Sequence, residues 1–214
     1  MSSKKVYLIR HGQTDYNLQG IVQGSGVNSS LNETGRHQAA LFFARYKDIP
    51  FDKVYISTLQ RSMQSVQGFL DMGLPHEQHA GLNEISWGTR EGMHITPEED
   101  AYYYETLQRW RNGETNLCIE GGESPAQVAA RQQNFINLML SRPEEKTILI
   151  CMHGRAMRIL LSVLLHYPLS CMDIFEHQNL CLYQLDYTGS MFTVKKYCDV
   201  AHLQEPVEHR EAAK

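Results

Sequence analysis

The sequence lacks a run of about 18 apolar residues, so it predicts no transmembrane helix and no membrane partner. It also lacks a Cys-x-x-Cys pair, and its five cysteines are an odd number, which favours a reduced, cytoplasmic protein over a disulfide scaffold. No long apolar stretch follows the basic start, Met1 to Lys5, so we expect no secretory signal. Positive charge is not in excess, because 20 basic residues face 24 acidic ones. That balance disfavours a nucleic-acid partner.

The composition is that of an ordinary globular domain, with 42% apolar and 21% charged residues in a chain of 214. This length can bury a core without metal or disulfide support. We expect one domain over residues 1–203. The less regular segment from about 73 to 122 would form a small helical cap or substrate segment, and the polar tail at 204–214 would be disordered.

Strand and helix patterns alternate along the chain, which predicts an α/β fold with a mostly parallel sheet. Short β-prone apolar runs predict strands at 6–9, 54–56, 148–152, 180–185 and 192–197. Helical spacing predicts helices over about 34–47, 59–70, 97–111, 125–142 and 155–165. We expect Ser57 to cap the second helix, and capping boxes at 96–99 and 124–127 to start the third and fourth. Residues 10–30 are predicted to be a long functional loop.

Polar and basic residues follow three of these strands directly. Arg10-His11-Gly12 follows the first, Ser57 and Arg61 follow the second, and His153-Gly154 follows the strand near residue 150. Ligands of parallel sheets bind beyond the carboxyl ends of the strands, so we expect these loops to meet. Arginine forks match phosphate oxygens, and backbone N–H groups at helix starts favour anions. The sequence therefore predicts a phosphate site in which histidine is the reactive group.

Five motifs in order resemble the histidine phosphatase superfamily, also called phosphoglycerate-mutase-like. The matching stretches are Arg10-His11-Gly12-Gln13-Thr14 with Asn17, Ser57-Thr58-Leu59-Gln60-Arg61, Leu82-Asn83-Glu84-Ile85 with Gly88 and Glu91-Gly92, Gly122-Glu123-Ser124, and Met152-His153-Gly154. They span nearly the whole chain. The resemblance implies a three-layer α/β/α sandwich with the small cap.

The resemblance also implies a role for each matching residue. His11 would be the nucleophile that accepts the phosphoryl group, and Glu84 would donate a proton to the leaving oxygen. The phosphate oxygens would be held by Arg10, Asn17, Arg61, His153 and the Gly154 N–H, with Gln23 as a further candidate. As an alternative, the side chains of Asn17 and Gln23 would only form hydrogen bonds that stabilise backbone turns. The scheme requires no metal and no cofactor, and its partner is a small phosphorylated substrate.

Elementary electrostatics is consistent with these roles. Arg10 and Arg61 disfavour the imidazolium, which keeps His11 neutral and nucleophilic. Preorganised cations stabilise the charge that spreads over the transferring phosphoryl group. A bound phosphate dianion favours protonation of Glu84, which can then act as the acid.

Three functions fit this site. The segment between Glu84 and Gly122 has no adjacent arginine pair, whereas the mutases of the family carry one for a substrate carboxylate. The expected activity is therefore the phosphatase one, with a mutase-type phosphoryl transferase as the alternative. A catalytically silent phosphate-ester binder is the third reading, and the complete catalytic set argues against it. Ile21 and Val22 are apolar where many relatives are basic, so specificity is not carried over.

Two further motifs are explained by structure rather than by function. His76-Glu77-Gln78-His79 has the wrong spacing for the zinc motif His-Glu-x-x-His and reads as a polar loop. Tyr102-Tyr103-Tyr104 reads as a packed helix face rather than as the lining of a substrate entrance. The sequence leaves the substrate open. It also leaves the oligomeric state open, a homodimer being one option.

Overall fold

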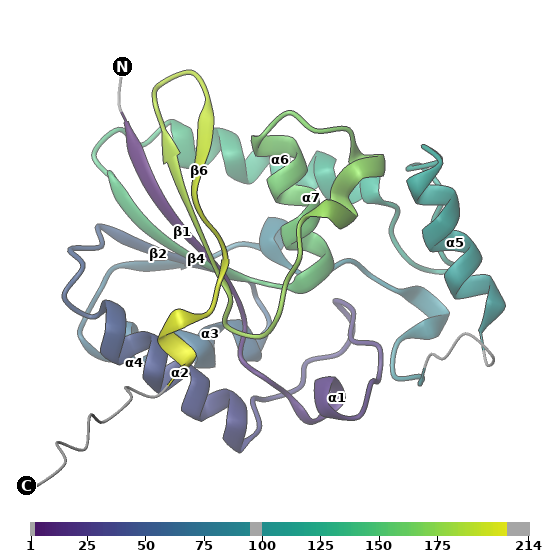
Figure 1. The fold of residues 1–214 in the computed structure, drawn as a ribbon, viewed down its shortest axis with the longest axis horizontal. Coiled ribbons are helices and arrows are strands. Elements are labelled where there is room, and N and C mark those ends of the chain that lie inside the picture. Colours follow the sequence, from purple (N-terminus) through teal and green to yellow (C-terminus); the bar gives the residue numbers. More distant parts are fainter. Residues whose placement is uncertain (1–2, 95–99, 205–214) are drawn as a thin grey trace, which may run out of the picture.

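The structure, a computed structural model, describes residues 3–94 and 100–204. Its centre is a six-stranded sheet with the order β3-β2-β4-β1-β5-β6 (Figure 1). The strands are β1 (Lys4–Arg10), β2 (Lys53–Ile56), β3 (His76–Gln78), β4 (Thr147–Met152), β5 (Leu182–Tyr187) and β6 (Phe192–Asp199). All five strands expected from the apolar runs are present.

Most of the sheet is parallel, as predicted. Strand β4 pairs in parallel with β1 on one side and with β2 on the other, and β2 pairs in parallel with β3. Strands β5 and β6 form an antiparallel hairpin beside β1. The prediction of a polar loop at His76 to His79 was wrong. Glu77 pairs with Lys53 and Arg142, and such polar side chains suit a short edge strand.

The longer helices lie close to the predicted positions. They are α2 (Glu33–Tyr46), α5 (Ala101–Arg111), α6 (Pro125–Leu140) and α7 (Gly154–Leu164). The capping box predicted for α6 is confirmed, because the Ser124 hydroxyl accepts from the Gln127 N–H and the Gln127 side chain accepts from the Ser124 N–H. The capping box predicted at 96–99 lies outside the described residues, as does the predicted tail from 205 onward. Asp100 precedes α5 and caps it, because its carboxylate accepts from the Tyr103 N–H.

Three local predictions need correction. The helix predicted over 59–70 is divided at Val66 into α3 (Gln60–Ser65) and α4 (Gln67–Asp71). The Ser65 hydroxyl donates to the Arg61 carbonyl four residues back, a bond that tends to bend helices. The N-cap of α3 is Leu59, not Ser57. The loop at 10–30 contains a short helix, α1 (Asp15–Leu18), which a Thr14–Asn17 capping box starts.

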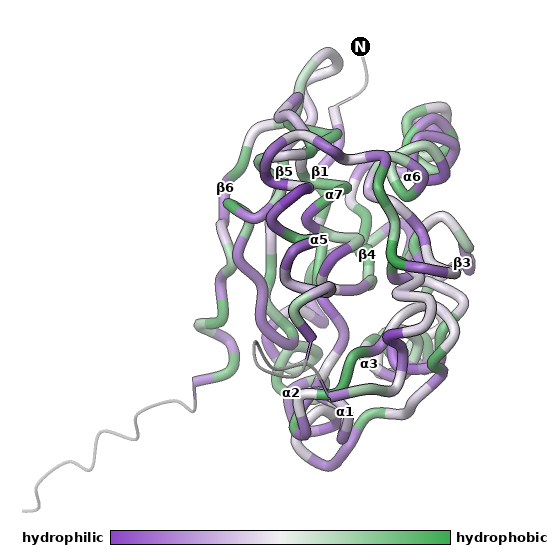
Figure 2. The backbone as a smooth tube through the Cα atoms, turned by 90° about the vertical axis from the view of Figure 1, so that its right-hand side faces the viewer, coloured by the Kyte–Doolittle hydropathy of each residue, from purple (hydrophilic) through white to green (hydrophobic). Residues whose placement is uncertain are grey.

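Helices cover both faces of the sheet and make three layers. Alternate strand residues face opposite sides: Tyr7 and Ile9 pack with the layer of α2 to α4, while Val6 and Leu8 pack with the layer of α6 and α7. Hydrophobic colour follows the central strands in Figure 2. Both faces are therefore buried, as expected for parallel strands. None of the described helices is long and apolar enough to cross a membrane.

One edge of the sheet collects several loop segments. Strands β1, β2 and β4 end there, and β5 begins there because it runs antiparallel to β1. Within the segment 73–122, helix α5 lies apart from the sheet, on the right of Figure 1. The three-residue 3-10 helices η1 (Ala80–Leu82) and η2 (Gly88–Arg90) precede it. The short η3 (Leu169–Ile174) follows α7, and η4 (Ala201–Leu203) follows β6.

Candidate active site

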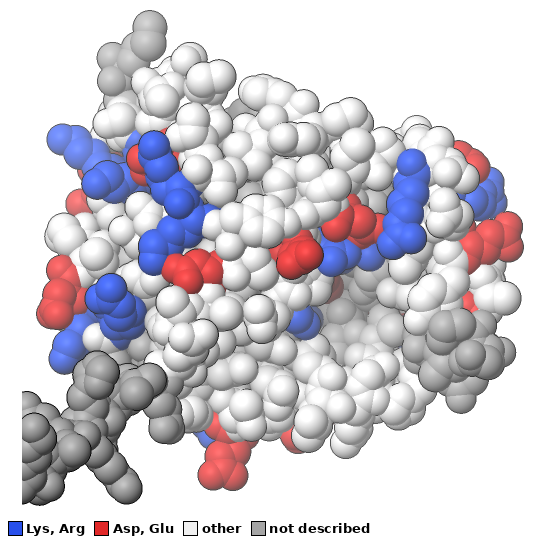
Figure 3. All heavy atoms as spheres, viewed as in Figure 1, with Lys and Arg blue, Asp and Glu red and all other residues white. Residues whose placement is uncertain are grey.

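A cavity of about 330 Å³ opens at this edge of the sheet. Figure 3 shows the molecule hollowed to the right of its centre, with Lys or Arg side chains at the border of the hollow. The cavity is lined by Arg10, His11, Asn17, Ile21, Val22, Gln23, Glu84, Trp87, Tyr103, Gly154, Arg155, Arg158 and His177. Six of the predicted site residues are among them. Arg61 and His153 are not on the wall.

His11 lies on the floor of the cavity, directly after β1, and is 3% exposed. Its Nδ1 is 2.7 Å from the Gly12 carbonyl oxygen, which can only accept, so Nδ1 carries the proton and Nε2 has a free lone pair. Burial, followed by the charges of Arg61 and Arg10, lowers the pKa of His11 well below its ordinary value. The ring is therefore neutral at neutral pH and has the tautomer of a nucleophile.

Close packing fixes the Gly12 backbone that orients His11. The Gly12 N–H donates to the Ser65 hydroxyl at 2.9 Å. A Cβ at this position would lie 2.6 Å from the Gly35 carbonyl oxygen. Only glycine therefore fits, and the turn that presents His11 is rigidly attached to α2 and α3.

Arg10 contributes positive charge and an unpaired donor beside His11. Its Nη1 donates to Nδ1 of His177 at 3.2 Å. Its Nε is buried and has no hydrogen-bond partner among the described residues. Burial and the charges of Arg10, Arg158 and Arg155 lower the pKa of His177 to about 2. A buried donor without a partner is costly, so Arg10 is suited to an anion that enters the cavity.

His153 and Arg61 lie behind His11. The rings of His11 and His153 are 5.1 Å apart between centroids. Arg61 Nε donates to Nδ1 of His153 at 3.2 Å, so Nε2 of a neutral His153 donates to the Ser57 hydroxyl at 2.7 Å. Burial and the Arg61 charge lower the pKa of His153 well below its ordinary value. Both ring nitrogens are thus occupied, and a direct contact of His153 with phosphate remains a prediction.

Arg61 itself is completely buried. Its remaining bonds go to backbone carbonyls, from Nη1 to Val27 and from Nη2 to Gly24. Burial lowers the pKa of Arg61 to about 10, so it stays cationic at neutral pH. Its charge lies next to the reactive histidine, and its hydrogen bonds to the two carbonyls connect the loop after α1 to α3.

Glu84 lines the same cavity as His11 and is 7% exposed. Its carboxylate accepts three backbone N–H groups: Oε1 from Ile85 at 2.9 Å and from Ala156 at 2.8 Å, and Oε2 from Arg155 at 3.1 Å. Two of these donors belong to the first turn of α7, where the helix dipole attracts negative charge. The carboxylate is therefore held in one orientation at the wall of the cavity.

Asn17 and Gln23 line the cavity near Arg10. Asn17 Oδ1 accepts from the Thr14 N–H at 3.2 Å and from Asn179 Nδ2 at 3.1 Å, which leaves the Asn17 amide N–H groups for a ligand. Gln23 Nε2 donates to the Thr14 hydroxyl at 2.7 Å. The turn chemistry considered for Asn17 is thus present, and it orients the side chain rather than excluding a binding role.

The motifs missed several residues of the site region. Asn179 contacts both Asn17 and the His11 carbonyl, and Arg155, Arg158 and His177 line the wall. Ser57, which the second motif includes, contacts His153. A signal existed for Arg158, since Arg155 and Arg158 are three residues apart at the start of a helix after a strand. The prediction of a packed face for Tyr102 to Tyr104 holds for Tyr103 alone, which packs on Trp87 and also lines the cavity. It was wrong for the two neighbours, which are about 40% exposed.

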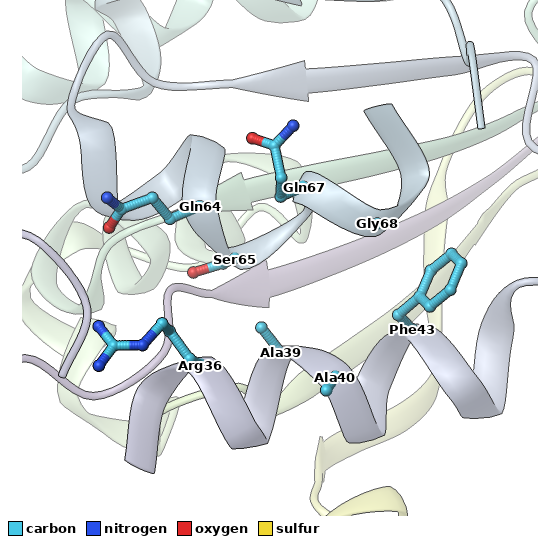
Figure 4. A pocket seen from close by; sticks show the side chains of 8 residues that line it. All are labelled: Arg36, Ala39, Ala40, Phe43, Gln64, Ser65, Gln67 and Gly68. Atoms are coloured by element: carbon cyan, nitrogen blue, oxygen red, sulfur yellow. The ribbon is translucent and has the colours of Figure 1, made fainter. Parts of the chain in front are cut away.

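A second cavity, of about 360 Å³, lies between α2 and the pair α3 and α4. Figure 4 shows the small side chain of Ala39 pointing from α2 toward α3 and α4. Arg36 is the one charged residue among those that line it. Ser65, whose hydroxyl accepts from the Gly12 N–H, lies between this second cavity and the loop that carries His11. The reactive groups are therefore those of the first cavity.

Three neutral histidines at the site predict a pH-dependent stability. In the unfolded chain His11, His153 and His177 titrate near pH 6.5, whereas the pKa of each is lowered in the fold. Below pH 6.5 the unfolded chain therefore binds protons that the folded chain does not. Well below pH 6.5, we expect the free energy of unfolding to fall by about 1.4 kcal/mol per pH unit for each histidine, or roughly 4 kcal/mol per pH unit for the three.

Urea unfolding between pH 7.5 and about pH 5 measures how this slope grows as the pH falls through 6.5. The His11→Ala variant should have a slope smaller by up to about 1.4 kcal/mol per pH unit, because one linked proton is gone. A stability that stays flat over this range would contradict the assignment of buried neutral rings.

Comparison with known proteins agrees with the arrangement just described. The model of the histidine phosphatase superfamily (branch 1) matches residues 6–200. The chain therefore belongs to this superfamily. It is 30% identical over 211 residues to "Probable phosphoglycerate mutase GpmB" of Yersinia pestis (strain Pestoides F), a match that covers 94% of this chain and 96% of the relative.

Solved structures of phosphatases are similar as well. The putative alpha-ribazole-5'-P phosphatase of Escherichia coli superposes with a TM-score of 0.81 at 25% identity, covering 92% of this chain and 96% of its own. The alpha-ribazole phosphatase of Shigella flexneri gives 0.80 at 27% identity, covering 91% and 96%. Family and neighbours together support an enzyme of the phosphatase and mutase kind.

Proposed function

We propose that the chain hydrolyses phosphate monoesters through a phosphohistidine formed on His11. One observation supports this most directly. The Gly12 carbonyl fixes the proton of His11 on Nδ1, so Nε2 is free to act as the nucleophile. His11 shares its cavity with Arg10 and Glu84. A neutral nucleophile, a cationic anion site and a proton carrier are the three components that phosphoryl transfer to histidine requires.

In the first step, Nε2 of His11 attacks phosphorus and the ester P–O bond breaks. The leaving alkoxide takes a proton from Glu84, which acts as the general acid of this step. The product is an alcohol, with the phosphoryl group on His11. The developing imidazolium charge is stabilised through Nδ1–H by the Gly12 carbonyl.

In the second step, water attacks the phosphohistidine. Glu84, now ionised, accepts a proton from the water, and the P–N bond breaks to return Nε2 its lone pair. Inorganic phosphate leaves, and the site is restored. Each step uses groups of this chain, so the scheme calls for neither a metal nor another cofactor.

The phosphate oxygens would lie between β1 and the start of α7. Arg10 offers its buried Nε, Asn17 its amide N–H groups and Gly154 its backbone N–H. Gln23 adds an amide at the rim. Arg61 supplies charge from behind, and a contact from His153 would require it to give up its bond to Ser57.

A mutase-type phosphoryl transferase is the second candidate, because the relative from Yersinia pestis is named a probable phosphoglycerate mutase. Both reactions share the first step and differ in the acceptor of the phosphoryl group. The names of the two alpha-ribazole phosphatases support water as the acceptor. The segment 85–121 also lacks an adjacent arginine pair for a three-carbon acid.

A labelling and chase experiment tests the proposal. The chain is freed of metal with EDTA, mixed with radiolabelled p-nitrophenyl phosphate and quenched in alkali, in which phosphohistidine survives. We expect label on the peptide that contains His11 and none in the His11→Asn variant. The exposed His37 offers a matched control, since His37→Asn should label like the unaltered chain.

The chase identifies the acceptor. Labelled protein is diluted into buffer with or without 3-phosphoglycerate, and we expect the label to appear as inorganic phosphate in both. Transfer of most label to the three-carbon acid would favour the mutase instead. If EDTA abolishes labelling, or if the label lies on another residue, the mechanism is wrong. Tight binding without any labelling would indicate a silent binder.

A further inference from the structure

Two arginines of α7 give the cavity a second cationic wall. Arg155 and Arg158 line it beyond Glu84, and neither belongs to the residues proposed to hold the phosphate. Arg155 Nη1 donates to Asp173, and among the described residues its side chain makes no other hydrogen bond. Its side chain is 9% exposed. Its remaining guanidinium N–H groups are therefore available to a ligand.

Positive charge exceeds negative charge on this wall. Asp173 accepts from three arginines at once: from Arg155 and Arg158 through Oδ1 and from Arg111 through Oδ2. One carboxylate cannot neutralise three guanidinium groups. Burial and the neighbouring charge of Arg155 lower the pKa of Arg158, which is the direction expected where like charges are close. An additional anion would relieve this repulsion.

Aromatic rings hold the Arg155 side chain in place. Its guanidinium carbon lies 5.9 Å from the ring centre of Trp87 and 5.7 Å from that of Trp110. The two indoles are stacked, and Tyr103 packs on Trp87. A guanidinium fixed between a carboxylate and two rings is preorganised, so it loses little entropy when it binds a ligand.

The position of the proton donor directs the leaving group toward this wall. Glu84 must reach the leaving oxygen, and its Oε2 accepts from the Arg155 N–H at 3.1 Å. The alcohol part of the substrate therefore extends from the phosphate past Glu84. Arg155, Trp87 and Tyr103 line the same cavity as Glu84 and are the groups available to it there.

We propose that the alcohol part of the substrate carries a carboxylate, which Arg155 binds with the support of Arg158. The carbon skeleton between the phosphate and the carboxylate lies against Trp87 and Tyr103. This inference rests on the proposed function, because it takes the orientation of the ester from the role of Glu84. It identifies Arg155 as a specificity-determining residue of the site.

Binding of stable analogues tests this without catalysis. Carboxybenzylphosphonate and carbamoylbenzylphosphonate, as meta and para isomers, have nearly the same shape and differ in the charge of one group. Calorimetry with the native chain should show the better carboxylate isomer binding at least about tenfold more tightly than its amide, the effect of one charge-assisted hydrogen bond. In Arg155→Gln this ratio should fall to about twofold or less.

Two further variants control for structural effects. Arg111→Gln removes another partner of Asp173, but Arg111 is half exposed and does not line the cavity, so the ratio should stay at the native value. Arg155→Lys keeps the charge without the fork and should give an intermediate ratio. If Arg155→Gln does not fold, the comparison of Arg155→Lys with the native chain decides.

The outcomes separate this inference from the proposed function. A native ratio below about twofold, or an undiminished ratio in the Arg155 variants, would overturn the carboxylate subsite even if p-nitrophenyl phosphate is hydrolysed. A tenfold ratio that depends on Arg155 supports the subsite even if p-nitrophenyl phosphate is not hydrolysed, in which case the hydrolase mechanism fails instead.

Discussion

Replacement of His11 by alanine is expected to lower kcat for phosphate monoester hydrolysis by about 10⁴-fold or more. The variant lacks the nucleophile: His153 uses both ring nitrogens in bonds to Arg61 and Ser57, and the Nδ1 of His177 accepts from Arg10. Water would have to attack the ester directly. Steady-state release of p-nitrophenolate in EDTA measures the loss.

Binding provides the control for this variant. Arg10 and Asn17 remain in place, so inorganic phosphate should still bind to the folded His11→Ala chain. Alanine at the exposed His37 should leave kcat unchanged, since His37 lies on α2 away from the cavity. Activity above about 1% in folded His11→Ala would show that the phosphoryl group does not pass through this ring.

The parts of the fold that the sequence predicted are those with long-range patterns of burial. Strands β1 and β4 are continuous apolar runs because both faces of the sheet are covered. Helix α6 starts where Ser124-Pro125 allows a cap. The reactive residues could be predicted because parallel strands bring their carboxyl ends to one edge. His11 and the His153 region meet there through the pairing of Arg10 with Met152.

The missed features depend on single contacts that no local pattern reports. Strand β3 has three polar residues, and its pairing with β2 depends on Lys53 and Glu77 facing each other across the edge. The division between α3 and α4 lies next to Ser65. Its hydroxyl donates to the Arg61 carbonyl and accepts from the Gly12 N–H. Hydrophobic periodicity alone gives no sign that the helix is interrupted at this serine.

His177 and Asn179 were missed for a topological reason. Both residues precede β5, and the start of a strand is not where parallel-sheet ligands are expected. Because β5 runs antiparallel to β1, its start lies at the carboxyl edge. Asn179 can thus reach the His11 carbonyl and Asn17. The direction of that one strand had to be known before these residues could be assigned to the site.

Replacement of Glu84 by glutamine should separate the two steps of the reaction. Glutamine can keep the bonds from Ile85 and Ala156 to Oε1, but its NH₂ group faces the Arg155 N–H that Oε2 accepted. We expect a loss of stability of about 1 to 3 kcal/mol from this donor left without an acceptor. The glutamine cannot donate a proton to an alkoxide. For an alkyl phosphate, kcat should fall by about 10² to 10⁴-fold, the usual contribution of a general acid.

A substrate with a good leaving group needs no acid in the first step. With p-nitrophenyl phosphate, the Glu84→Gln variant should still phosphorylate His11 and then stall, because its water is not activated. Stopped-flow absorbance should therefore show a burst of p-nitrophenolate equal to the amount of protein, followed by slow turnover. Glu120→Gln, at an exposed position of the same segment, should behave like the native chain. Equal losses for both substrates without a burst would mean that Glu84 only orients α7, and the proton would have to come from another group.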